Sequence, residues 1–169
     1  KTLNKKRVSN ICLGTWALGG NNKKLQAYGK LKEKPENILK YSFKKKINFF
    51  DTANVYGGGL SEQVLGNFLS IQGTQKDKLF HIATKAGIAV NKDNGRRYFD
   101  NSPAHIKAEL EKSLSRLGLD YVDLFYIHRR DNETPIEEVT ETLAALIKAG
   151  KIGAFGFSEI SPTSLYRAA

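Results

Sequence analysis

The chain has 169 residues, 40% of them hydrophobic, which is enough for one folded domain with a core and argues against intrinsic disorder. Its net charge is +10, but the basic residues are scattered and form no aromatic-interleaved stripe or recognition-helix pattern. No apolar run approaches the ~20 residues that cross a bilayer. We therefore predict neither nucleic acid nor a membrane as a partner.

Two features at the start of the chain bear on its location. The basic segment 1–7 has no apolar block behind it, so it is not typical of a signal peptide. The single cysteine, Cys12, cannot form an internal disulfide and lies in an apolar run. We therefore expect a small core residue rather than a nucleophile, in a protein of the reducing cytoplasm.

The first half of the chain predicts three strands and two helices. The strands are short, nearly continuous apolar runs, typical of parallel strands buried on both faces. Pro35 opens the first helix, which ends at a lysine-rich segment, and Ser61 is a candidate cap for the second. An irregular stretch, Gly19–Lys34, precedes the first helix. The strands are predicted at Asn10–Leu13, Ile47–Asp51 and Leu79–Thr84.

The second half repeats the alternation after another irregular stretch, Ala86–Asn101. Ser102-Pro103 supplies cap and first-turn chemistry for a helix that Gly118 can end. Thr134-Pro135-Ile136-Glu137 is a capping-box candidate for a helix that runs to Gly150. Ser161-Pro162 begins a further helix. Two more strands are predicted, at Val122–Ile127 and Ile152–Phe157.

Strands alternating with helices predict an α/β fold with a parallel sheet. A doubly wound sheet would need a phosphate-binding glycine turn, and neither Gly14–Gly20 nor Gly57–Gly59 has the spacing for one. A (β/α)₈ TIM barrel needs eight strands. We therefore predict one domain, residues 1–169, with about five of the eight βα units and truncated at its C-terminal side.

Ionisable side chains stand at the ends of three successive predicted strands. Asp51 ends the second, Lys85 follows the third and His128 ends the fourth, while Tyr56 lies in the loop after Asp51. In a barrel all four would face one mouth, where active sites form. Each has a structural alternative, as a turn cap, a solvated lysine, a core histidine or a loop aromatic. Their common position favours a functional group.

These four side chains fit the reduction of a carbonyl. Hydride transfer needs a proton for the developing alkoxide, and Tyr56 can supply it beside the Lys85 ammonium, which stabilises phenolate. Asp51 can hold Lys85, and His128 can bind the carbonyl oxygen. The hydride must come from a cofactor. Schiff-base aldol chemistry on Lys85 is a weaker alternative, and three histidines, two of them away from the mouth, predict no metal site.

Several segments resemble the aldo-keto reductase family, in order, from about Val8 to Ala169. Its perakine-reductase-like branch looks closest, through the run His128–Asp131. The segments are Gly14–Trp16, Asn48–Gly57, Leu60–Gly66, Ala83–Lys85, Ser113–Leu124, Tyr126–Arg129 and Gly156–Ser158.

The resemblance implies NADP(H)-dependent reduction of an aldehyde or ketone. The family's catalytic tetrad falls on Asp51, Tyr56, Lys85 and His128. It implies cofactor contacts from Gly14, Thr15, Trp16, Asp51 and Ser158, and substrate contacts from Trp16, Tyr56 and His128.

Two departures from the family pattern matter. Glu159 stands where many members have asparagine, which puts one carboxamide contact in doubt. The sixth to eighth strands, which hold much of the cofactor, have no counterpart before residue 169. We therefore expect weak cofactor binding and self-association through an exposed barrel edge. The alternatives are an inactive truncated protein or a regulatory NADP-binding subunit.

Overall fold

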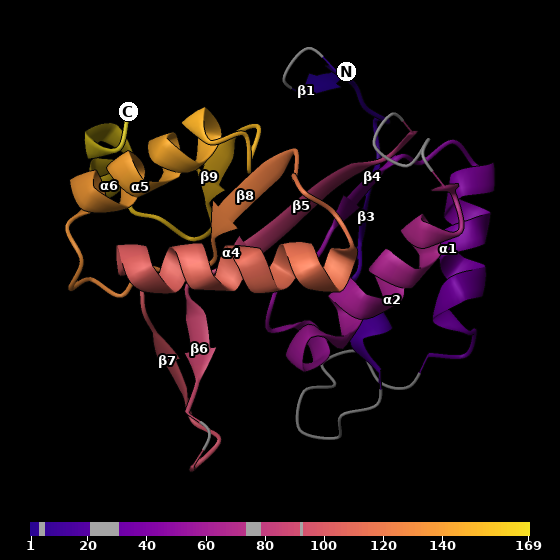
Figure 1. The fold of residues 1–169 in the computed structure, drawn as a ribbon, viewed down its shortest axis with the longest axis horizontal. Helices are drawn as coiled ribbons and strands as arrows, with labels where there is room; N and C mark the ends of the chain where they lie inside the picture. The colour runs from indigo at the N-terminus through magenta and orange to yellow at the C-terminus, as the bar shows by residue number, and fades with distance from the viewer. Residues whose placement is uncertain (4–5, 21–30, 74–78, 92) are drawn as a thin grey trace.

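The computed structural model describes residues 1–3, 6–20, 31–73, 79–91 and 93–169. Five parallel strands form one sheet in the order β3-β4-β5-β8-β9, so each strand joins the one before it (Figure 1). All five predicted strands are confirmed, each with bounds shifted by a few residues. They are β3 (Cys12–Gly14), β4 (Phe49–Asp51), β5 (His81–Ala86), β8 (Leu124–Ile127) and β9 (Phe155–Phe157).

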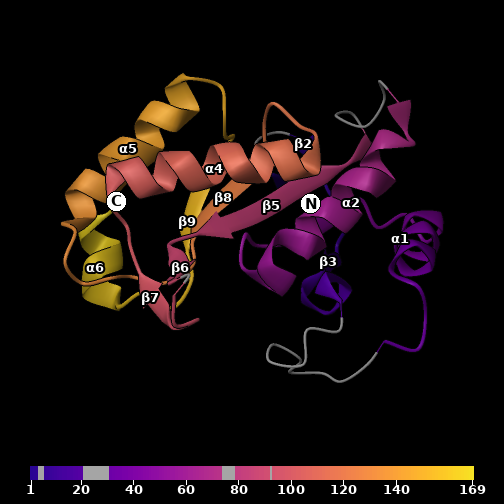
Figure 2. The same ribbon diagram turned by 60° about the horizontal axis from the view of Figure 1, so that its bottom comes forward.

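Helices cover the outer face of this curved sheet (Figures 1 and 2). Their apolar stripes pack on the strands, and Phe50 and Phe125 from the sheet meet Leu65, Ile106 and Leu143 from the helices with no exposed surface on any of the five. Burial of such side chains supplies the main stabilising term of the fold. The helices are α1 (Pro35–Lys44), α2 (Leu60–Ser70), α4 (Pro103–Leu117), α5 (Ile136–Lys148) and α6 (Pro162–Arg167), with short 3₁₀ turns η1 (Trp16–Gly19) and η2 (Tyr56–Gly59).

Of the three predicted N-caps, Ser102 is confirmed and Ser61 and Thr134 are wrong, while the helix predicted to begin at Ser161-Pro162 is confirmed. Ser102 and Ser161 accept hydrogen bonds from backbone amides three residues on, as N-caps do. Ser61 instead lies inside α2, which begins after Gly59, and its hydroxyl donates to Thr15. Thr134 makes no cap, because its hydroxyl donates to Asp131 and the helix begins after Pro135.

The stretch predicted to be irregular after β5 contains an antiparallel hairpin. Strands β6 (Ile88–Val90) and β7 (Arg97–Phe99) pair and project beyond the end of the main sheet (Figure 1). A second small hairpin, β1 (Thr2–Leu3) with β2 (Lys6–Arg7), precedes β3. Most of the other irregular stretch, Gly19–Lys34, lies outside the described residues.

The inner side and the edges of the sheet are less covered than its outer face. Strand β3 pairs with β4 alone among the described strands, and its Cys12 is exposed. The prediction of a buried core cysteine is therefore wrong, because it assumed that both faces of this strand are covered. No helix in the described part of the chain is long and apolar enough to span a membrane.

Candidate active site

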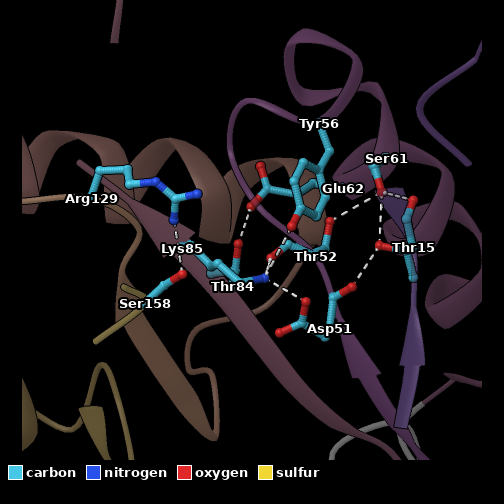
Figure 3. A network of polar contacts seen from close by, with 10 residues as sticks. All are labelled: Thr15, Asp51, Thr52, Tyr56, Ser61, Glu62, Thr84, Lys85, Arg129 and Ser158. Atoms are coloured by element: carbon cyan, nitrogen blue, oxygen red, sulfur yellow. Dashed lines mark hydrogen bonds and ion pairs between the residues drawn. The ribbon is translucent and has the colours of Figure 1, made fainter. Parts of the chain in front are cut away.

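Asp51 and Lys85 meet at the carboxyl ends of two neighbouring strands, β4 and β5 (Figure 3). The Lys85 ammonium donates hydrogen bonds to the Asp51 carboxylate and, over 2.8 Å, to the Thr52 carbonyl. It also lies 3.4 Å from the Tyr56 hydroxyl. The Lys85 side chain is only 10% exposed, so its charge acts on these partners with little screening by water.

Tyr56 stands between two other aromatic side chains. Trp16 stacks on its ring with 5.8 Å between centroids, and the His128 ring meets it edge-on, also at 5.8 Å. The structure thus brings Asp51, Tyr56, Lys85 and His128 together at one end of the sheet, as the strand ends predict.

His128 follows β8, where its backbone amide donates to the Ala86 carbonyl over 2.7 Å. Burial lowers the pKa of its imidazole from 6.5 to about 4, and the positive charges of Lys85, Arg129 and Arg97 act in the same direction. The imidazole is therefore neutral near pH 7. Its Nδ1 is buried and has no hydrogen-bond partner among the described residues.

A buried hydroxyl cluster joins the ends of β3 and β4 under the site (Figure 3). The hydroxyl and amide of Thr15 both donate to the Asp51 carbonyl, and Ser61 donates to Thr15. Thr52 in turn donates to Ser61 over 3.1 Å. Thr15 has no exposed surface, so its side chain has no accessible face for the cofactor contact that the sequence resemblance implies.

Beside this cluster, a buried carboxylate joins two helices to β5. Glu62 of α2 has no exposed side-chain surface and accepts hydrogen bonds from Arg116 of α4 and from Thr84. Thr84 immediately precedes Lys85 in the strand. The contact therefore fixes the position of β5 at the residue before the central ammonium.

Comparisons with known sequences identify the family of this chain. A model described as "Aldo/keto reductase family" matches residues 10–169. The chain belongs to the aldo-keto reductase family. An aldo-keto reductase of Schizosaccharomyces pombe whose name specifies NADP(+) is 34% identical over 158 residues, covering 94% of this chain and 44% of that protein. Aldo-keto reductase YhdN of Bacillus subtilis is 37% identical over 155 residues, covering 91% and 44%.

Two solved structures have the same fold as this chain. A glycerol dehydrogenase from Gluconobacter oxydans superposes with a TM-score of 0.80 at 34% identity, over 95% of this chain and 48% of that one. An aldo-keto reductase from Bacillus halodurans in its holo form gives 0.79 at 29% identity, over 96% and 50%. The prediction of a partial TIM barrel is confirmed: the chain spans about half the length of these reductases, or less. The perakine-reductase-like branch stays a prediction.

One residue of the site was not predicted from the sequence. Arg129, after His128, donates to the Ser158 hydroxyl over 3.1 Å and to the His128 carbonyl over 2.8 Å (Figure 3). It also pairs with Glu159 at 2.8 Å. Arginine in a polar run is usually solvated, so no sequence signal distinguishes it here.

A separate cleft of about 570 Å³ lies outside the tetrad, between the β6–β7 hairpin, α4 and η2. Its lining includes Asn54, Tyr98 and the basic side chains of Arg97, Lys112 and Arg116. None of the four tetrad residues lines it. This cleft is therefore not the place where the tetrad would act on a substrate.

Proposed function

We propose that this protein reduces an aldehyde or ketone to an alcohol with NADP(H), and that Tyr56 is the proton donor. The observation that carries the proposal is the position of the Lys85 ammonium, which contacts Asp51 and the Tyr56 hydroxyl at once. The His128 ring meets the ring of the same tyrosine edge-on. A small-molecule carbonyl compound is the substrate class that this arrangement suits.

The strand ends fit a nicotinamide ring. Gly14 pairs with Asp51 across β3 and β4, and space for a further atom is open above its Cα. Trp16 is 39% exposed beside Tyr56, which leaves a flat surface next to the tetrad. We propose that Gly14, Trp16, Asp51 and Ser158 hold the cofactor, with Thr15 supporting Asp51 from below. When bound, NADPH would supply the hydride that no side chain provides.

The Tyr56 hydroxyl would donate the proton that the substrate oxygen needs. As the substrate oxygen gains negative charge, Tyr56 donates to it and the Lys85 ammonium stabilises the resulting phenolate across 3.4 Å. The Asp51 carboxylate accepts a hydrogen bond from Lys85 and so fixes the direction of the ammonium. Trp16 would pack against the substrate beside Tyr56.

His128 would orient the carbonyl as a neutral imidazole. Because burial and nearby cations lower its pKa to about 4, it does not compete with Tyr56 as an acid near pH 7. Its Nδ1 is buried, so Nε2 is the nitrogen that would donate to the substrate oxygen. A preorganised donor of this kind stabilises charge that develops in the transition state.

The same contacts disfavour a Schiff-base aldolase. A nucleophilic lysine must lose its proton, and the Lys85 ammonium would then lose its ion pair with the Asp51 carboxylate. The single cysteine supports our further proposal that the protein works in the cytoplasm. A regulatory subunit that binds NADP(H) without turnover remains the rival that an assay must separate.

The test is NADPH oxidation in the presence of an aromatic aldehyde, compared between the natural protein and Tyr56→Phe. We expect the variant to lose at least about a hundredfold in kcat, which is the usual contribution of a positioned general acid. Trp16 is the only tryptophan, so quenching of its fluorescence measures NADPH binding independently of turnover. That binding should survive the substitution.

Tyr166→Phe is the matched control, because Tyr166 is 87% exposed on α6. It should leave both readings unchanged. If Tyr56→Phe oxidises NADPH as fast as the natural protein, Tyr56 is not the proton donor. Fluorescence quenching without turnover in the natural protein would favour the regulatory subunit, and an adduct on Lys85 trapped by borohydride would favour the aldolase.

A further inference from the structure

Arg129 joins the ends of two neighbouring strands at the candidate active site. Its Nη1 donates to the His128 carbonyl after β8 and to the Ser158 hydroxyl after β9, over 2.8 and 3.1 Å. Its Nη2 pairs with the Glu159 carboxylate at 2.8 Å. The guanidinium thus uses its fork of donors on three acceptors, while its side chain is 30% exposed.

The hydrogen bond from Arg129 determines which hydrogen-bonding role remains for the Ser158 hydroxyl. A guanidinium has donors and no acceptor, so the Ser158 oxygen must be the acceptor in their hydrogen bond. The Ser158 backbone amide is already used, since it donates to the Ile127 carbonyl over 2.9 Å. None of the described residues accepts a hydrogen bond from the Ser158 hydroxyl, which therefore keeps its proton for a ligand.

Glu159 is held by the same guanidinium. Its backbone has a φ of +54°, in the left-handed region that is unfavourable for most side chains. The ion pair with Arg129 holds the carboxylate against the guanidinium. Arg129 therefore orders both residues of the turn that follows β9.

We propose that Arg129 is a positioning residue that makes the Ser158 hydroxyl a hydrogen-bond donor to a carboxamide oxygen. This inference rests on the proposed function, in which Ser158 contacts the nicotinamide end of the cofactor. Arg129 itself need not touch the cofactor. Its effect should therefore depend on Ser158 and on the oxygen of the carboxamide, and not on the cofactor's charge.

The test compares the affinities of NADP(+) and its thionicotinamide analogue, in which sulfur, a weaker acceptor, replaces the carboxamide oxygen. Binding is followed by quenching of Trp16 fluorescence. Because both ligands carry the same phosphates, their ratio of dissociation constants cancels any general effect of charge. We expect the natural protein to prefer NADP(+) by about fivefold, the worth of one hydrogen bond.

Arg129→Met and Ser158→Ala should each reduce this preference to less than about twofold, and the double variant should reduce it no further. Arg130→Met is the matched control, because Arg130 donates to Thr134 and Asn101 and not to Ser158. It should retain the preference. Arg129→Lys should restore part of it, since lysine keeps a donor but loses the fork.

A measurement without cofactor separates this inference from the proposed function. In the free protein, the guanidinium protons of Arg129 should give slowly exchanging NMR signals that Ser158→Ala shifts. Slow signals without any NADPH binding would remove the proposed function, and the inference with it. NADP(+) binding whose preference survives Arg129→Met would overturn the inference alone, as would guanidinium signals that Ser158→Ala leaves unchanged.

Discussion

Replacement of Arg116 by methionine should strongly destabilise the protein, because it leaves the Glu62 carboxylate buried without a cation. Glu62 has no exposed side-chain surface, and its bond to Arg116 Nε is 2.7 Å long. Removing one partner of a buried pair typically costs about 3–5 kcal/mol. The hydrogen bond from Thr84, 2.6 Å long, remains and offsets part of this loss. We therefore expect a free energy of unfolding lower by about 3 kcal/mol.

Urea unfolding measures this change as a shift of the midpoint at constant slope. Arg167→Met is the matched control, since Arg167 pairs with Glu137 on the surface, where both side chains are more than half exposed. Adding Glu62→Gln to Arg116→Met should recover much of the loss, because an amide is buried at lower cost than a charge. A midpoint shift for Arg116→Met no larger than that for Arg167→Met would refute the reasoning.

Two further predictions concern pH and backbone space. Because the pKa of His128 falls from 6.5 to about 4 on folding, the unfolded chain binds the proton more readily and stability declines as the pH drops through this interval. The free energy of unfolding should fall by roughly 2 kcal/mol, once partial solvent access to His128 is allowed for. Urea unfolding of His128→Gln should show a free energy of unfolding that depends less on pH. An unchanged pH dependence would contradict the lowered pKa. Gly57→Ala should lower Tm clearly more than Gly58→Ala. Both glycines have a positive φ, but a Cβ at Gly57 would collide with the Gly19 backbone, whereas Gly58 has open space. Equal Tm values for the two variants would contradict this packing.

Much of the fold was predictable because its signals are local. Each parallel strand is a short apolar run, and a polar residue at its carboxyl end marks where the chain leaves the core. Asp51 and Lys85 could thus be placed at one mouth before their contact was known. The wrong caps show the limit of such signals. Ser61 has the residue type of a cap, but its hydroxyl bonds to Thr15, 46 positions away in sequence.

The β6–β7 hairpin was missed although it carries a turn signal. Asn94-Gly95 separates its two strands, and the Asn91 side chain accepts from two amides of the turn. Its strands have only three residues each, too few to show a period. Arg129 was not recognisable at all, since its role depends on where the turn after β9 lies relative to β8.

The order of the strands in the five-stranded sheet follows their order in the chain, and this bears on how the sheet can form during synthesis. Within the five-stranded sheet, each strand from β4 onward pairs with the strand of that sheet that comes before it in the chain. A chain emerging from the ribosome can therefore add one strand at a time to an existing edge, without breaking earlier pairs. The tetrad would gather in the same sequence, with Asp51 and Tyr56 in place before Lys85 arrives and His128 last.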